Sequence, residues 1–237
     1  MIQHINYKTL IYLTFTFIVF TIIGTISHEY GHIIVAKLLG HDTTLHYGSM
    51  THHNPIFNQW VFDTYHENKE AIENGTNFSK KALFDELTNI TNQHSLLIRM
   101  GGPLQTMTTG TIGFFILLYR RKNNRHSPFN LIDWSSTFLS LFWLRQVYNY
   151  LVSIGHEIVL PNGHFFGGDE RYIANSLEIW SGSIATITAI IGFVISSIVI
   201  FRLIPKSYLH TFIIAGFIGG TVGYVIWFHA LGPLILP

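Results

Sequence analysis

The 237-residue sequence contains no cysteine. Disulfide cross-links and thiolate metal ligands are therefore excluded, and any metal site must be built from histidine, aspartate or glutamate. Charged residues are also scarce, at 11% of the chain, and the formal net charge is only +1. A broad nucleic-acid-binding surface needs a basic patch, so we expect no nucleic-acid partner.

Apolar residues dominate the chain instead. Hydrophobic residues make up 48% of it and aromatic residues 15%, a composition typical of an integral membrane protein. A helix of about 20 apolar residues crosses the hydrocarbon core of a bilayer. The sequence therefore predicts an all-α, multi-pass protein of the cell membrane with about five transmembrane helices, at residues 10–39, 95–119, 132–154, 181–203 and 209–230.

A long polar stretch, residues 42–94, separates the first two predicted spans. It is too long and too charged for a tight turn, so we expect a small extramembrane insertion within one domain that covers residues 1–237. Its segment TTLHYGSM, residues 43–50, predicts a short strand. The basic residues after the second span should be cytoplasmic, which places residues 42–94 outside; they are Arg120, Arg121, Lys122 and Arg125.

The first predicted span ends in ionisable side chains, within the stretch TISHEYGHIIVAKLLG. His28 and His32 are four residues apart, so on a helix both imidazoles lie on one face and can reach one metal ion. Glu29 is adjacent to His28. In such an H-E-x-x-H arrangement the metal lowers the pKa of a bound water and the glutamate acts as general base, which is the chemistry of amide hydrolysis.

The depth of these residues in the membrane supports a functional role. With the apolar run centred near residue 23, His28 lies about 7 Å beyond the centre at about 1.5 Å per residue, inside the hydrocarbon layer. The alternative is that both histidines only form hydrogen bonds within a helix bundle. Three clustered ionisable groups are costly at this depth, which favours a reaction centre.

A catalytic zinc site usually has three protein ligands and one open position. The third ligand must come from a distant part of the chain. We prefer Asp169, because Gly167 and Gly168 before it let the backbone approach closely. As an alternative role, Asp169 also suits the N-cap of the helix predicted after it. The second choice of ligand is His164, and the remaining candidates are Asp133, His156, Glu157, Glu170 and Glu178.

Three motifs together resemble the site-2 protease family of intramembrane zinc metalloproteases. They are HEYGHIIVAKLLG at residues 28–40, GGPLQT at residues 101–106 and FFGGDER at residues 165–171. The resemblance implies a three-helix catalytic core and a zinc site formed by His28, His32 and Asp169. This sequence departs from the family pattern in two places: Thr106 stands where an asparagine is usual, and Asp169 follows its glycines instead of preceding them.

The resemblance also implies a function. Such a protein is an endopeptidase that hydrolyses peptide bonds of a membrane-protein or peptide substrate in or beside the bilayer, with Glu29 as the base. Because helical carbonyls are already hydrogen-bonded, the substrate must unwind locally. The segment TTLHYGSM resembles the edge strand with which some family members pair an extended substrate.

Other polar residues have two possible roles. Arg145 and Asn149 are four residues apart in the third predicted span and either contact the substrate or transition state, or hold helices together. Gly102 and Pro103 are typical of a helix kink or close packing, and the resemblance adds an approach to the substrate or metal. Two loop histidines, His52 and His53, are expected to be solvated rather than to bind a second ion.

Two rival functions are weaker. A metal-binding transporter or metal-handling membrane protein would also place His and Asp at membrane depth, but it has no need for a general base beside its first ligand. A catalytically inactive binding protein would not need the complete H-E-x-x-H motif. The sequence predicts neither the substrate's identity nor the oligomeric state.

Overall fold

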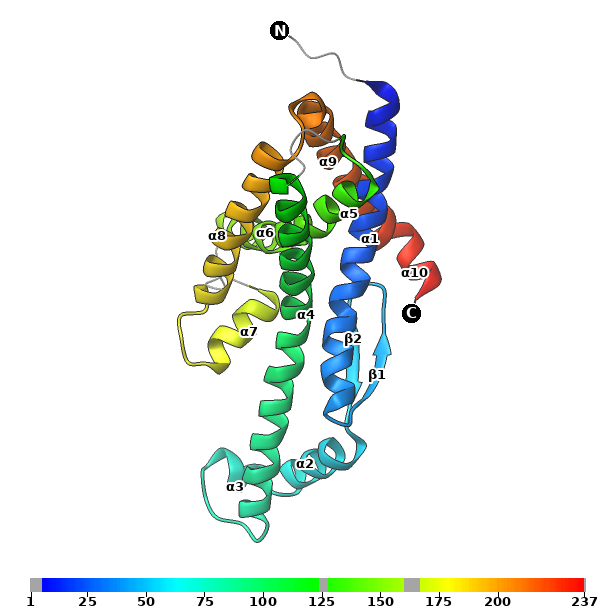
Figure 1. Cartoon of the computed structure of the whole chain (residues 1–237). Helices are drawn as coiled ribbons and strands as arrows, with labels where there is room; N and C mark the ends of the chain where they lie inside the picture. The colour runs from blue at the N-terminus through cyan, green and yellow to red at the C-terminus, as the bar shows by residue number, and fades with distance from the viewer. Residues whose placement is uncertain (1–5, 124–127, 160–166, 237) are drawn as a thin grey trace.

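The computed structural model describes residues 6–123, 128–159 and 167–236. The protein is mostly helical, at 82%, and its described strands form one hairpin (Figure 1). The elements are α1 (Tyr7–Leu38), β1 (Asp42–Leu45), β2 (Met50–His53), α2 (Pro55–Glu67), α3 (Lys69–Glu73), α4 (Lys81–Asn123), α5 (Leu131–Ser140), η1 (Leu141–Trp143), α6 (Leu144–Val159), α7 (Gly168–Ser176), α8 (Ser183–Ile198), η2 (Val199–Leu203), α9 (Lys206–Ile226), η3 (Trp227–Leu231) and α10 (Gly232–Ile235).

Helices α1 and α4 run side by side and form the spine of the molecule (Figure 1). They approach each other at Gly31 and Gly101, where a Cβ on either residue would collide with the backbone of the other. The helix backbones can therefore come close only because both residues are glycine. This contact brings the motif of the first predicted span directly against the GGPLQT motif of α4.

The buried face of α1 is unusual because it is polar. Buried residues gather in the second half of this helix, and they include Thr25, His28, Glu29 and His32. These positions repeat every three or four residues and so lie on one face. Apolar side chains such as Ile34, 55% exposed, point outward. A helix that is apolar outside and polar inside is suited to lipid, with a polar centre enclosed by its neighbours.

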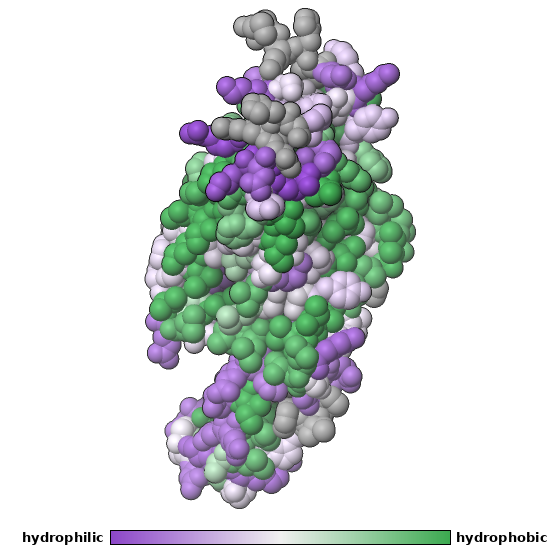
Figure 2. Space-filling view, viewed as in Figure 1, coloured by the Kyte–Doolittle hydropathy of each residue, from purple (hydrophilic) through white to green (hydrophobic). Residues whose placement is uncertain are grey.

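Three helical segments are long and apolar enough to span a membrane: Tyr7–Leu38, Ser183–Leu203 and Lys206–Ile235. They correspond to the first, fourth and fifth predicted spans. Figure 2 shows the matching surface, with an apolar band between two polar ends. The length and composition of these three segments indicate a membrane protein with three candidate spans.

The second and third predicted spans, at residues 95–119 and 132–154, are not among the three candidate spans of the structure. Residues 95–119 lie inside the long helix α4, but Gln105 and four threonines between residues 101 and 113 make this stretch too polar to stand with the other three. Residues 132–154 do not form one helix. The 3-10 turn η1 at Leu141–Trp143 divides them into α5 and α6, and α6 lies across the spine rather than along it (Figure 1).

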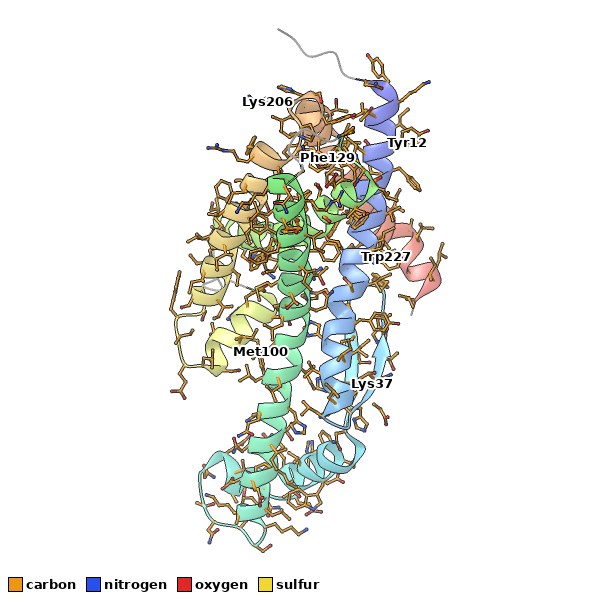
Figure 3. All side chains as sticks on the ribbon, viewed as in Figure 1. Tyr12, Lys37, Met100, Phe129, Lys206 and Trp227 are labelled. Atoms are coloured by element: carbon orange, nitrogen blue, oxygen red, sulfur yellow. The ribbon has the colours of Figure 1, made fainter. Side chains whose placement is uncertain are left out.

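The polar stretch at residues 42–94 contains the hairpin, α2, α3 and the first turns of α4. The segment predicted as one strand is a hairpin, in which Asp42 pairs with His53 and Leu45 with Met50. The prediction of an all-α protein is therefore wrong for this segment. Helices α2 and α3 lie at the far end of α4 (Figure 1). Figure 3 marks Lys206 at the opposite end of the molecule, and Lys37 close to the hairpin.

Candidate metal centre

His28, His32 and Asp169 meet although they are far apart in the sequence. The Nε2 atoms of His28 and His32 are 3.3 Å apart. The Oδ2 atom of Asp169 lies 3.3 Å from each of these two nitrogens. Ligand bonds of about 2.0–2.1 Å around a tetrahedral zinc ion place neighbouring ligand atoms about 3.3–3.4 Å apart. The three atoms therefore form an equilateral triangle of the size that one face of such a site requires.

The outer ring nitrogens of both histidines are held by α4. His28 Nδ1 is 2.9 Å from Thr106 Oγ1, and this hydroxyl donates to the carbonyl of Gly102 at 3.1 Å. His32 Nδ1 is 2.7 Å from the carbonyl of Ile98. Both Nδ1 atoms therefore act as donors, which leaves the Nε2 lone pairs facing the centre of the triangle. Metal-binding histidines are held in this way.

Gly102 leaves the space in front of the histidines open. A Cβ on this residue would lie against His32 Nε2 and 2.6 Å from His28 Nε2. The two glycines of GGPLQT thus have different tasks, because Gly101 permits the helix crossing and Gly102 clears the triangle. Pro103 is also buried beside them, and its missing N–H leaves the carbonyl of Arg99 without a helical partner.

Asp169 enters the site from the first turn of α7. Gly168 has a φ of 70°, a left-handed conformation that favours glycine. The expected reason for the glycines, a close backbone approach, is not borne out within the described residues, where a Cβ on Gly167 would meet nothing within 4 Å and one on Gly168 would make an ordinary contact with Glu170. The capping alternative is also wrong, because the N-cap is Gly167. The second-choice ligand, His164, lies outside the described residues.

Within the described part of the chain, His28, His32 and Asp169 are the only group of three that could hold a metal. Asp133 is instead paired with Arg120 at 2.8 Å and belongs to the capping box of α5. None of the remaining candidates, His156, Glu157, Glu170 and Glu178, joins the triangle. Of these four residues, Glu170 is the one next to Asp169 in the sequence, and its carboxylate interacts electrostatically with Arg145.

The groups around the triangle carry an excess of negative charge. Arg145 interacts electrostatically with three carboxylates, those of Glu29, Asp169 and Glu170. Glu29 and Glu170 are buried, at 6% and 4% exposed. With neutral histidines, these three carboxylates outnumber the two guanidinium groups beside them, those of Arg145 and Arg99, by one. A bound cation would offset this excess of negative charge.

The structure brings Arg145 and Asn149 of α6 beside the triangle of candidate ligands. The side chain of Asn149 forms a hydrogen bond with Glu170. The Nε of Arg145 is buried and has no hydrogen-bond partner in the described part of the chain. A buried donor without a partner is costly, so this atom is available to a ligand that enters the site.

Sequence reasoning missed the roles of three groups that surround the triangle, those of Thr106, Ile98 and Arg99. Thr106 was noted only as a departure from the family pattern, although it holds His28. The carbonyl of Ile98 carries no sequence signal at all. Arg99 could have been found, because an arginine inside a predicted span is unusual, whereas Glu170 was considered as a ligand and not as a charge beside one. Arg99 lies 3.6 Å from Asp169.

A second group of histidines lies where α1, the hairpin and α4 meet. His41 Nδ1 is 3.3 Å from His52 Nδ1, and His41 Nε2 is 2.9 Å from His94 Nδ1. Burial lowers the pKa of His41, and the neighbouring imidazoles of His52, His94 and His53 lower it further. Burial also lowers the pKa of His52. The prediction of solvated loop histidines is therefore correct for the exposed His53 and wrong for His52.

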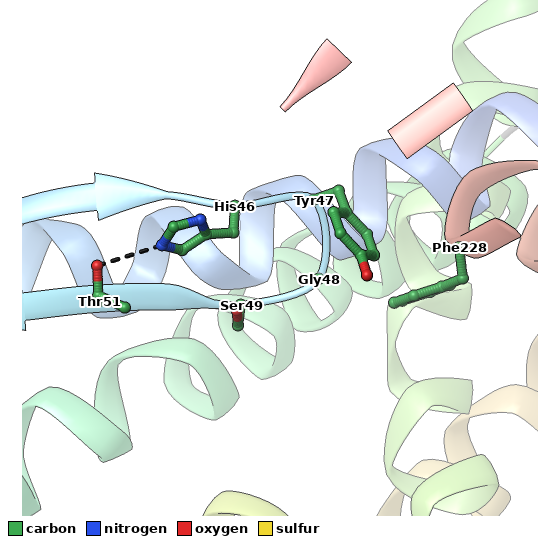
Figure 4. Close-up of a pocket in the computed structure, with 6 residues that line it drawn as sticks. All are labelled: His46, Tyr47, Gly48, Ser49, Thr51 and Phe228. Atoms are coloured by element: carbon green, nitrogen blue, oxygen red, sulfur yellow. Dashed lines mark hydrogen bonds between the residues drawn. The ribbon is translucent and has the colours of Figure 1, made fainter. Parts of the chain in front are cut away.

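A hollow of about 460 Å³ lies at the turn of the hairpin. Figure 4 shows Phe228 of η3 facing Tyr47 beside it, while His46 is hydrogen-bonded to Thr51. Trp227 holds the turn in place by donating from Nε1 to the carbonyl of Tyr47 at 2.6 Å. The hollow is lined by neither histidine of the triangle, so it is separate from the metal centre.

Comparison with protein-family models, with curated proteins and with solved structures gives no match. The likeness to the site-2 protease family thus stays a hypothesis carried by three motifs. The function proposed below depends on the geometry of the metal centre.

Proposed function

We propose that this protein is a zinc-dependent intramembrane endopeptidase of the site-2 protease type. The observation that carries the proposal is the triangle of His28, His32 and Asp169, with Glu29 next to the first ligand. A structural cluster of histidines would not need its Nε2 atoms to face a common point. A hydrolase needs this convergence together with an adjacent base.

The donor set fits zinc. Two imidazole nitrogens and one carboxylate oxygen leave an open fourth position, as in catalytic zinc sites. The excess of carboxylates over guanidinium groups around the triangle favours a bound cation. When bound, zinc would lower the pKa of a water molecule and polarise a substrate carbonyl.

The residues of the chain have distinct roles in the proposed reaction. Glu29 takes a proton from the attacking water as its oxygen adds to the carbonyl carbon of the substrate. As the C–N bond breaks, Glu29 delivers that proton to the leaving nitrogen. Arg145, whose Nε is unpaired, stabilises the negative charge that develops on the carbonyl oxygen. Asn149, Gly102 and Pro103 line the space in which the substrate backbone lies.

The hairpin supplies a place for the substrate. A two-stranded sheet has a free edge on each strand, and an extended peptide can pair with it. β2 is the strand close to the metal centre, because His52 on it interacts electrostatically with His32 and Arg99. A membrane-protein segment that unwinds locally would therefore pair with β2 as it reaches the triangle.

We also propose that the core is formed by α1, α4 and the α7 segment, within a cell-membrane protein of about five spans. α4 and the α5–α6 pair would complete the three candidate spans. Arg120, Arg121 and Lys122 would face the cytoplasm, with the hairpin, α2 and α3 on the other side. Arg125, the last member of the predicted cluster, lies outside the described residues.

The decisive variant is Glu29→Gln, because glutamine keeps the shape of the side chain and removes the base. Loss of a general base lowers rates by about 10²–10⁴. Membrane peptides from cells that produce the parent or Glu29→Gln would be compared by mass spectrometry. New chain termini in the parent sample should be absent or strongly reduced with Glu29→Gln, while purified Glu29→Gln keeps its zinc.

The matched control is Glu86→Gln, which makes the same change at an exposed position of α4. Cells that produce Glu86→Gln should contain the same new peptide termini as cells that produce the parent. Equal termini from Glu29→Gln would overturn the peptidase proposal. A metal-handling protein would be favoured instead if the parent and Glu29→Gln cells had the same peptide termini and accumulated the same amount of zinc.

A further inference from the structure

Asp169 has two carboxylate oxygens, and each has a different partner. Oδ2 lies 3.3 Å from both histidine Nε2 atoms. Oδ1 lies 3.6 Å from Nη1 of Arg99 on α4. The guanidinium therefore attracts the oxygen that points away from the triangle.

Arg99 contacts α7 at a second point. Its Cζ lies 4.2 Å from the ring centroid of Tyr172, a distance typical of a cation–π contact. Tyr172 follows Asp169 by three residues, so both side chains leave the same face of α7. A single arginine thus contacts two residues on one face of α7.

This anchoring matters because the ligands come from different parts of the chain. His28 and His32 are both on α1 and are fixed by α4, whereas Asp169 arrives on a separate nine-residue helix. α7 packs against α4 and α8, and Arg99 is the α4 residue that reaches the ligand itself. Outer partners of metal ligands set their orientation and affect affinity.

We propose that Arg99 is a positioning residue that holds Asp169 as a one-oxygen ligand of the metal. This inference depends on the proposed metal centre but not on the peptidase reaction. With Oδ1 engaged by Arg99, only Oδ2 faces the metal and the fourth position stays open. Without Arg99, the carboxylate can rotate, so Oδ1 is free to bind as well and to fill the coordination position needed by water.

The test uses Co²⁺ added to the purified full-length protein without substrate. Arg99→Gln should bind Co²⁺ about 10–100-fold more weakly, the range for loss of an outer partner. Its visible absorption should be weaker per bound ion, because a second carboxylate oxygen converts a four-coordinate site to a five-coordinate one. Arg99→Lys keeps the charge and should recover part of the affinity. Tyr172→Leu should have a smaller effect, since the ion pair remains.

The matched control is Arg202→Gln, at an exposed arginine on η2. It should bind Co²⁺ as the parent does, and thermal unfolding would show that each variant is folded. An Arg99→Gln protein with the affinity and spectrum of the parent would overturn the role of Arg99 alone. Co²⁺ binding that is unchanged in Asp169→Ala would overturn the metal centre itself, and the role of Arg99 with it.

Discussion

The protein has two groups of three side chains rich in histidine, one buried and one partly buried, and they differ in where their nitrogens point. In the metal centre, two Nε2 atoms and one carboxylate oxygen lie 3.3 Å from one another. In the second group, His41 uses both of its nitrogens, one toward His52 and the other toward His94. The first arrangement converges on a point, and the second is a chain.

The difference separates a group of side chains that could hold a metal ion from one that needs none. Each contact between two histidines in the chain needs one N–H donor and one acceptor nitrogen. A neutral imidazole has one of each, so the chain needs no metal ion. In the triangle the protons are on the outer nitrogens, which Thr106 and Ile98 engage, so the inner lone pairs face one another. Lone pairs that face one another are stable only with a cation or a proton between them. Proximity of histidines is therefore weak evidence for a metal, and convergence is strong evidence.

The largest expected effect comes from filling the triangle. Gly102→Ala places a Cβ against both Nε2 atoms, so the rings must move apart and zinc affinity should fall by more than about 100-fold, the upper limit for outer partners. Gly220→Ala is the control, because its Cβ would meet no described residue within 4 Å. Zinc content after dialysis against a chelator would be measured by elemental analysis. A Gly102→Ala protein that retains zinc like the parent would contradict a metal at this point.

A smaller loss of zinc is expected when the outer contact of His28 is removed. Thr106→Val keeps the shape but deletes the hydroxyl that accepts from Nδ1, so affinity should fall about 10–100-fold. Thr106→Ser should retain it. The control is Thr108→Val at an exposed position of the same helix. Competition with a chelator gives the dissociation constants, and equal values for Thr106→Val and Thr108→Val would mean that the ring is not oriented by Thr106.

The sequence predicted the parts of the candidate metal centre that depend on local spacing. His28 and His32 share a helix face because the helical repeat places residues four apart together, and α1 has the expected polar face. Asp169 was preferred among seven candidates for a reason that the structure corrects, since Gly168 serves a left-handed turn. Local patterns carry no information on how α7 docks on α4, so Arg99 was not found.

The helices were predictable where hydropathy alone decides. Three apolar segments correspond to candidate spans, whereas α4 mixes apolar and polar residues because it faces the metal centre as well as its surroundings. The division of residues 132–154 at Leu141–Trp143 had no signal in glycine or proline. The hairpin was recognised only in part, because pairing between residues 42–45 and 50–53 depends on a partner strand and not on one segment.

The smallest expected effect tests the chain of histidines through pH. The pKa values of His41 and His52 are lowered in the folded protein, chiefly by burial, with His53 and His94 acting on His41 and Arg99 and His32 acting on His52. The unfolded chain therefore takes up protons first as the pH falls below the ordinary value of about 6.5. The stability from these groups is complete above that pH and is lost as the pH decreases through it.

His52→Gln should separate this contribution from the rest of the protein. Loss of the contact with His41 costs about 1 kcal/mol, so the melting temperature should fall by about 2–4 °C near pH 7.5. The difference from the parent should shrink toward pH 5.5, about one unit below the ordinary histidine value, because the variant no longer carries one of the two histidines with a lowered pKa. His66→Gln makes the same substitution at an exposed site on α2, away from this group of histidines, and is the matched control. With saturating zinc in all samples, protonation of the metal ligands affects each protein equally, so a constant difference between His52→Gln and the parent would show that the histidine chain is not sensitive to acid.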